Sequence, residues 1–146
     1  MVCTFFGHSD CYGLDTNILR SAIEDLIRKG VDTFYVGTHG RFDSLVFSAL
    51  LELEKIYPHI AVSAVLAYLP VERSAYDPYG GHEIYPEIEE GPQRFAIERR
   101  NKWMIKQAKN GYCVCFVNRT WGGAYKFAKR AKAQGLTVVN LGTAKL

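Results

Sequence analysis

Short apolar runs alternate with amphipathic segments along this chain, and that alternation is what most constrains its fold. Each apolar run resembles a β-strand, and the segment after it repeats its apolar residues at helical spacing. The runs lack strict polar alternation, which is typical of strands covered by helices on both faces. The expected strands are Val2–Phe6, Thr33–Val36, Ile60–Leu66, "YCVCFVN" and "LTVVNL". The sequence therefore predicts a Rossmann-like three-layer α/β/α fold with a mostly parallel sheet of about five strands.

Capping signals bound the expected helices. Asp15 or Thr16 can begin the first helix and Gly30 can end it. The other expected helices are Leu45–Tyr57, about Gln93–Ala108, and Ala124–Ala133. A chain of 146 residues is the size of one domain, so we expect residues 1–146 to fold as a single unit. The irregular segment 70–92, rich in Pro, Gly, Tyr and Glu, is expected to be a lid, a partner surface or a disordered loop.

The composition indicates a soluble cytoplasmic protein. Hydrophobic residues make up 48% of the chain, but the apolar runs are too short to cross a bilayer, and no secretory signal is evident, so no membrane partner is expected. The four cysteines form no Cys-x-x-Cys pair and are expected to be buried thiols. The four histidines lack ligand spacing, so we expect no metal and no cofactor.

Charge is distributed unevenly along the chain. Residues 1–98 contain 7 Lys and Arg against 15 Asp and Glu, whereas residues 99–146 contain 11 Lys and Arg and no acid. A solvated helix face explains part of this excess. A segment without carboxylates also suits an anionic partner, either a phosphorylated small molecule or a nucleic acid.

Three strand-to-helix turns carry unusual chemistry: "GHSDCYG", "GTHGRFD" and "NRTWGG". Such turns gather at the carboxyl edge of a parallel sheet, where ligands bind. Glycines there let backbone amides approach an anion, and the helix N-termini behind them favour negative charge. The candidate ligand-binding residues of these turns are Gly7, His8, Gly37, His39, Gly40, Arg41, Thr120, Trp121, Gly122 and Gly123. The alternative for the second turn is structural, with Asp43 capping a helix, Phe42 in the core and His39 facing solvent.

The helix "QRFAIERRNKWMIKQA" adds two candidates. Ile97, Met104 and Ile105 define its apolar face, and Asn101 falls on that face at four-residue spacing. An inward amide needs hydrogen-bond partners, and Arg100 lies beside it. The pair is either a structural hydrogen-bond hub or suited to hold a phosphate or a ribose.

Taken in order, "FFGHSD", "GTHGRFD", "ERRNKWM" and "WGGAYKFAKRA" resemble the SLOG superfamily, a Rossmann-like group that includes DprA and the LOG phosphoribohydrolases. The resemblance spans nearly the whole chain and is nearest to small stand-alone SLOG proteins. It implies binding of a nucleotide or nucleotide-derived ligand, and a homodimer or higher homo-oligomer. The Tyr-rich segment 70–92 is apolar for an exposed loop and suits such an interface.

LOG enzymes, to which the chain is more distantly similar, use an arginine in a Met-His-Glu-Arg-Lys helix and a glutamate in a Pro-Gly-Gly loop. The first motif places that arginine at Arg100, with Asn101 in the place of the lysine. The second matches only Gly122 and Gly123 and puts Lys129 in the place of the glutamate. The resemblance therefore implies a phosphate site without the catalytic carboxylate, and we expect no catalytic residue.

Binding without catalysis, with a signalling nucleotide as one possible ligand, is thus the leading hypothesis. A LOG-like nucleotide N-glycosidase is the alternative, with an acid drawn from Glu98, Glu83, Glu87, Glu89 and Glu90. Single-stranded nucleic-acid binding of the DprA kind is a third possibility, favoured by the basic last third of the chain. Trp121, Tyr79 or Tyr85 could stack on a base, although packing is the commoner role of such residues.

Overall fold

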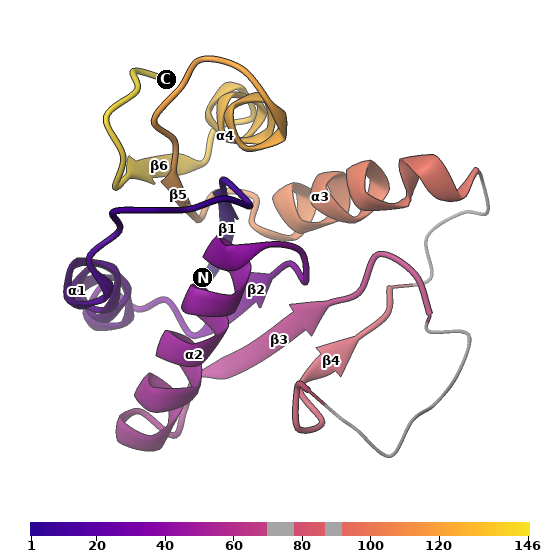
Figure 1. Ribbon diagram of the computed structural model, residues 1–146. Helices are drawn as coiled ribbons and strands as arrows, with labels where there is room; N and C mark the ends of the chain where they lie inside the picture. The colour runs from indigo at the N-terminus through magenta and orange to yellow at the C-terminus, as the bar shows by residue number, and fades with distance from the viewer. Residues whose placement is uncertain (70–77, 87–91) are drawn as a thin grey trace.

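Six strands form the middle layer of the computed structural model, which describes residues 1–69, 78–86 and 92–146, and their order across the sheet is β4-β3-β2-β1-β5-β6 (Figure 1). All neighbouring strands are parallel. The strands are β1 (Val2–Gly7), β2 (Thr33–Val36), β3 (Ala61–Val65), β4 (Glu83–Ile84), β5 (Tyr112–Phe116) and β6 (Thr137–Asn140). The helices are α1 (Thr16–Arg28), α2 (Arg41–Ile56), α3 (Ala96–Gln107) and α4 (Gly123–Ala133), with a 3-10 turn η1 (Gln93–Phe95) before α3.

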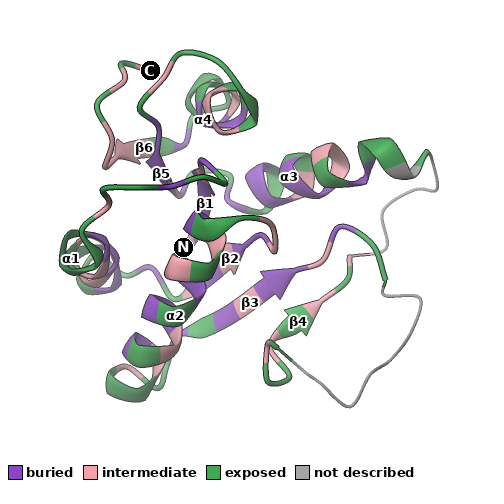
Figure 2. Cartoon of the chain, viewed as in Figure 1, coloured by how far each residue is buried: buried purple, intermediate pink, exposed green. Residues whose placement is uncertain are grey.

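The helices cover both faces of the sheet, which confirms the predicted three-layer α/β/α fold. Helices α1 and α2 lie on one face and α3 and α4 on the other (Figure 1). Successive residues of β1 point to opposite faces: Phe5 packs with the α1 and α2 side chains, and Phe6 packs with those of α3 and α4. The central strands and the inner helix faces are the buried part of the molecule (Figure 2).

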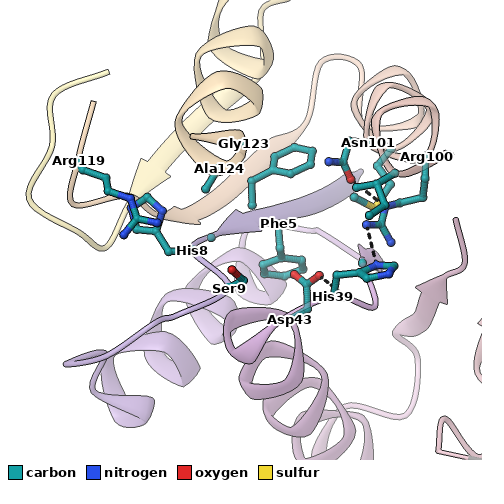
Figure 3. A pocket seen from close by; sticks show the side chains of 15 residues that line it. Phe5, His8, Ser9, His39, Asp43, Arg100, Asn101, Arg119, Gly123 and Ala124 are labelled. Carbon is teal, nitrogen blue, oxygen red and sulfur yellow. Dashed lines mark hydrogen bonds between the residues drawn. The ribbon is translucent and has the colours of Figure 1, made fainter. Parts of the chain in front are cut away.

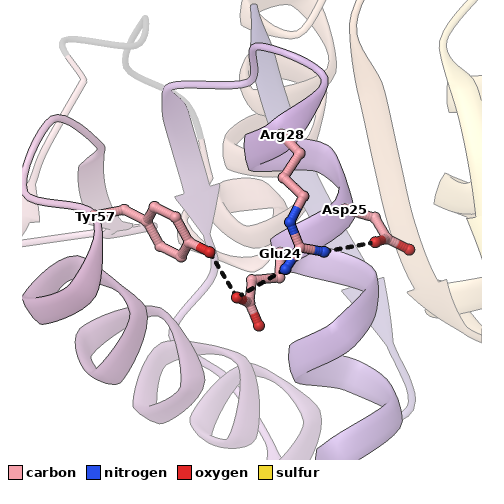
Figure 4. Close-up of polar contacts among 4 residues, drawn as sticks. All are labelled: Glu24, Asp25, Arg28 and Tyr57. Atoms are coloured by element: carbon pink, nitrogen blue, oxygen red, sulfur yellow. Dashed lines mark hydrogen bonds and ion pairs between the residues drawn. The ribbon is translucent and has the colours of Figure 1, made fainter.

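Helix α1 begins and ends as the sequence predicts. The Asp15 side chain accepts a hydrogen bond from the Asn17 amide at 2.8 Å, and Gly30 follows the helix with a φ of 101°. A polar cluster also connects α1 with α2: Tyr57 at the end of α2 donates to the Glu24 carboxylate at 2.6 Å, and Arg28 pairs with the same carboxylate at 3.4 Å (Figure 4). This cluster joins the C-terminal ends of α1 and α2, at the edge of the sheet opposite to the glycine turns.

Strand β4 and the start of α2 differ from the sequence prediction. Glu83–Ile84 form a short parallel strand beside β3, inside the segment predicted as irregular, while residues 70–77 and 87–91 lie outside the described residues. Helix α2 begins at Arg41 rather than Leu45, because Gly40 is its N-cap residue. Asp43 therefore lies in the first turn of α2 and is not its N-cap, which corrects the predicted capping role.

The end of β6 is tied to the turn that follows β5. The Asn140 side chain accepts hydrogen bonds from the Val117 and Gly142 amides at 3.0 and 2.9 Å. It donates to the Val117 and Ala144 carbonyls at 3.1 and 2.8 Å. One amide thus uses its full hydrogen-bonding capacity to fix the backbone at Val117.

The four cysteines are buried free thiols, as expected. In the described part of the chain, no helix combines the length and the apolar character needed to cross a membrane.

Candidate functional site

A pocket of about 200 Å³ opens at the carboxyl edge of the sheet, where β1 lies between β2 and β5 (Figure 3). The chain runs outward from β1 through β2, β3 and β4, and then returns through α3 to β5 on the other side of β1. Ligands of open α/β sheets bind at such a reversal of strand order. The pocket is lined by Phe5, Phe6, Gly7, His8, Ser9, Gly37, His39, Asp43, Ile97, Arg100, Asn101, Met104, Arg119, Gly123 and Ala124.

The end of β1 is shaped by a close approach of α2. The Phe42 ring is fully buried and lies directly against Gly7, so that a Cβ at position 7 would overlap the ring. Phe42 is therefore a core residue, as the structural interpretation predicted. Glycine at position 7 lets the ring close the core beneath the pocket.

We expect Gly7→Ala to lower the free energy of unfolding by about 1 to 3 kcal/mol, because the added methyl group must displace a packed aromatic ring. Urea denaturation measures this. Gly123→Ala is the matched control, since a Cβ at position 123 meets no atom within 4 Å and position 123 begins α4. A Gly7→Ala protein as stable as the Gly123→Ala protein would contradict the close packing.

The turn between β2 and α2 is held against the loop that follows β1. Gly40 has a φ of 91°, and a Cβ there would approach the Cα of Ser9 to 2.5 Å. The Arg41 amide donates to the Ser9 carbonyl at 2.9 Å, and the Arg41 guanidinium lies 5.9 Å from the centre of the Tyr12 ring. Gly40 and Arg41 were predicted to contact a ligand, but in the structure they join two loops and do not line the pocket.

Arg100 is the central charged group of the pocket. Its side chain comes from the inner face of α3 and is only 2% exposed. Nε donates to Asn101 Oδ1 at 2.8 Å, and Nη1 donates to the Val65 carbonyl at 2.9 Å and to Thr38 Oγ1 at 3.4 Å. Nη2 makes a longer contact of 3.5 Å with His39 Nδ1. Two of the three nitrogens are thus well bonded, and Nη2 keeps donor capacity.

Gly37 separates the Arg100 guanidinium from the Asp43 carboxylate. A Cβ at Gly37 would lie 2.7 Å from Asp43 Oδ2 and 3.0 Å from Arg100 Cζ, so only glycine leaves room for both groups. Oδ2 of Asp43 accepts a hydrogen bond from the His39 amide at 3.0 Å. Burial raises the pKa of Asp43 to about 6, although the His39 hydrogen bond and the Arg100 charge oppose this shift.

Both pocket histidines are held neutral. Burial, and next the charge of Arg119, lower the pKa of His8, while burial and then Arg100 lower the pKa of His39. The Asn118 amide donates to His8 Nε2 at 3.0 Å, so the neutral His8 ring carries its proton on Nδ1. Arginine can only donate, so His39 Nδ1 accepts from Arg100. The neutral His39 ring therefore carries its proton on Nε2, which donates to the Tyr68 hydroxyl at 3.4 Å.

Arg119 enters the pocket from the turn after β5. Its two terminal nitrogens pair with the two Asp10 carboxylate oxygens at 3.4 and 3.2 Å, which joins this turn to the loop after β1. The Trp121 ring lies 4.4 Å from the guanidinium carbon. Arg119 Nε is buried and has no hydrogen-bond partner among the described residues.

Seven of the twelve predicted ligand-binding residues line the pocket, and the structure brings them together from β1, the turn after β2, α3 and the start of α4. They are Gly7, His8, Gly37, His39, Arg100, Asn101 and Gly123. The others are Gly40, Arg41, Thr120, Trp121 and Gly122, which do not line it. Gly122 is the N-cap of α4, and Trp121 is 66% exposed outside the pocket.

Sequence reasoning missed three polar lining residues, Ser9, Asp43 and Arg119. All three lie within the turns that the sequence singled out. Arg119 could have been found as the cation beside "TWGG", whereas Asp43 was assigned a capping role. Ile97, predicted to face the core, is 40% exposed and lies at the rim of the pocket instead.

The residues aligned with the LOG catalytic loop lie elsewhere. Lys129 is exposed on α4, with its ammonium 5.5 Å from the centre of the Tyr125 ring. Glu98 pairs with Lys126 and Lys102 at 3.2 and 3.3 Å, and these two cations lower the pKa of its carboxyl. Neither Lys129 nor Glu98 lines the pocket.

The remaining candidates come from the sequence on either side of β4. Glu83 is exposed on β4, whereas Glu87, Glu89 and Glu90 lie outside the described residues. Tyr79 packs edge-on against Phe47 at 5.2 Å between ring centres. Tyr85 is 40% exposed. Neither tyrosine lines the pocket.

No model of a known protein family matches the chain, and no curated protein matches it in sequence. Within residues 1–69, 78–86 and 92–146, no three His, Cys, Asp or Glu side chains gather as metal ligands would.

Proposed function

We propose that the protein is a SLOG-like module that binds a nucleotide or nucleotide-derived ligand at the carboxyl edge of its sheet without chemically changing it. One observation carries the proposal: Arg100, a buried arginine, lines a pocket at the strand-order reversal and keeps donor capacity on Nη2. A buried guanidinium is costly unless it is paired, and a phosphate oxygen would supply the missing partner. The homodimer implied by the family resemblance is part of the same proposal.

The shape of the pocket supports a phosphate or sugar phosphate as the enclosed part of the ligand. Its volume of about 200 Å³ is below the usual range for pockets that enclose a drug-sized molecule. Gly123 at the start of α4 offers an anion a helix N-terminus with no side chain in the way. The exposed Trp121 ring, 4.4 Å from the guanidinium carbon of the lining residue Arg119, would be available to stack on a base.

A thermal-shift screen tests this function. The wild-type protein is heated with AMP, GMP, CMP, UMP, ADP and cyclic mononucleotides, and at least one should raise the melting temperature in proportion to the logarithm of its concentration. Uridine and adenosine without phosphate should not. If no nucleotide stabilises the protein at millimolar concentration, the proposal is wrong.

A LOG-like N-glycosidase is the second candidate function, and Asp43 is the observation that favours it. A carboxyl group in a pocket, with a pKa raised to about 6, resembles the acids of catalytic sites. Asp43 is a different residue from the acids that the sequence suggested for this role.

We nevertheless expect wild-type protein incubated with AMP to release no adenine at an enzymatic rate. Glycosidic cleavage develops positive charge on the ribose and uses a charged carboxylate together with an acid. Here the Asp43 carboxylate faces the Arg100 cation across Gly37, and Glu98 is paired with two lysines. Chromatography of the reaction products measures adenine. Stoichiometric release that Asp43→Asn abolishes would establish the glycosidase instead.

A further inference from the structure

The pocket has two ends of the same chemistry. His39 and Arg100 lie at one end, and His8 and Arg119 lie at the other, well separated in the view of Figure 3. The residues of each pair interact: Arg100 contacts His39 Nδ1, and the charge of Arg119 lowers the pKa of His8. The described residues thus place one guanidinium and one neutral imidazole at each end of a single cavity.

Each end has an arginine N–H group without a close partner among the described residues. At the first end, the contact that Arg100 Nη2 makes within the described part of the chain is the 3.5 Å one with His39 Nδ1. At the second end, Asp10 holds the two terminal nitrogens of Arg119, while Nε is buried without a partner in the described residues. The His8 ring carries its proton on Nδ1, because Nε2 accepts from the Asn118 amide. An oxyanion at either end would find a cation and an imidazole together.

The space between the ends suits a hydroxylated linker. Ser9 and Gly123 lie between the two arginines in Figure 3, as does Asp43, which is the acidic group lining the pocket. Among the described residues, only the His39 amide donates to the Asp43 carboxylate, at Oδ2, so this carboxylate can also accept a hydroxyl, whereas it would repel a phosphate. Phe5 and Ala124 add apolar contacts. A ligand that matches this lining carries an anionic group at each end and a hydroxyl group between them.

We propose that the pocket binds ligands in which two separate anionic groups flank a pentose, as in a nucleoside 3′,5′-bisphosphate or a segment of a dinucleotide. This inference rests on the proposed nucleotide-binding function and adds a second anion subsite, formed by Arg119 and His8. The first subsite is formed by Arg100 and His39, and Asp43 lies against the sugar.

Calorimetry with four probes tests the second subsite: adenosine 5′-monophosphate, adenosine 3′-monophosphate, adenosine 3′,5′-bisphosphate and ADP. ADP carries an additional phosphate on the same end of the sugar, so it controls for charge alone. The 3′,5′-bisphosphate should bind at least roughly tenfold more tightly than each of the other three, since one more charge-assisted contact is made. Arg119→Gln should remove that preference.

Arg41→Gln is the matched control, because the Arg41 guanidinium also lies over an exposed aromatic ring, that of Tyr12, but Arg41 does not line the pocket. It should leave the preference unchanged. Imidazole ¹⁵N spectra of the wild-type protein give a readout that needs no variant: the bisphosphate should shift both His8 and His39.

Equal affinity for ADP and the 3′,5′-bisphosphate, or a preference that survives Arg119→Gln, would overturn the second subsite. If AMP still binds in that case, and still shifts the imidazole ¹⁵N signals of His39, the proposed nucleotide-binding function is retained. If none of the four probes binds and no nucleotide of the thermal-shift screen stabilises the protein, both the function and the second subsite are wrong. If only a nucleotide with another base stabilises it, the same four probes are made with that base and the same outcomes apply.

Discussion

Arg100→Ala is expected to weaken AMP binding strongly and also to destabilise the fold. A charge-assisted contact to phosphate contributes roughly 1.5 to 3 kcal/mol, so its loss weakens binding about 10- to 150-fold. The same substitution leaves Asn101 Oδ1 and the Val65 carbonyl without their donor. An unpaired buried group costs about 1 to 3 kcal/mol. Calorimetry and urea denaturation of the same sample measure the two effects.

Two further variants separate binding from folding. Arg99→Ala removes the neighbouring arginine, whose side chain donates to the Pro92 carbonyl outside the pocket, and should change affinity little. Arg100→Lys keeps the charge but lacks the planar guanidinium that donates to Asn101 and Val65 from separate nitrogens, and it should restore part of the affinity. If the folded fraction of Arg100→Ala bound AMP as tightly as the wild type, Arg100 would be a structural residue only.

Asp43→Asn is expected to stabilise the protein at neutral pH by roughly 2 to 3 kcal/mol. The pKa of Asp43 is about 6 in the folded protein, against an ordinary value of 3.8, so the folded state binds the proton more tightly. This contribution to stability is complete below about pH 4 and is lost as the pH rises through 6. An asparagine remains neutral, and its carbonyl oxygen can still accept from the His39 amide.

Unfolding free energies measured from pH 4 to 8 test the sign of this pH dependence. The wild-type curve should fall between pH 4 and about 6.5 relative to the Asp43→Asn curve. Asp25→Asn, which changes an exposed carboxylate of α1 that pairs with Arg28, is the control and should shift stability by at most about 0.5 kcal/mol. A variant less stable than the wild type at pH 7.5 would mean that the charged carboxylate is favourably paired.

The fold could be predicted from the sequence because alternating apolar runs and amphipathic helices leave few arrangements open. Strand β4 was missed because two residues form no apolar run, and Glu83 and Ile84 gain their structure only from pairing with β3. The start of α2 was misplaced because Gly40 offers no side-chain cap that could be recognised in the sequence. Sequence patterns therefore located the helices and strands whose own residues form an apolar pattern. They did not locate an element such as β4, which forms only by pairing with a neighbouring strand.

The candidate site was predicted in outline only. Glycines and residues next to them gave five of the seven correct lining positions, because backbone that lies close to a pocket often requires glycine. The other two, Arg100 and Asn101, were found from the helical spacing of α3. Asp43 and Arg119 reach the pocket through side chains whose direction depends on tertiary packing. Sequence spacing cannot distinguish a carboxylate that turns toward Arg100 across Gly37 from one that caps a helix.

We expect the Asn140 side chain to be conserved among homologous chains, although it does not contact the pocket. It is not a lining residue, yet its two donor and two acceptor contacts hold the backbone from which the Asn118 amide reaches His8. Aspartate has the same shape but no donors, and leucine has neither donors nor acceptors. Among homologous chains, position 140 should therefore vary as little as the glycines of the turns, while the exposed residues around it drift freely.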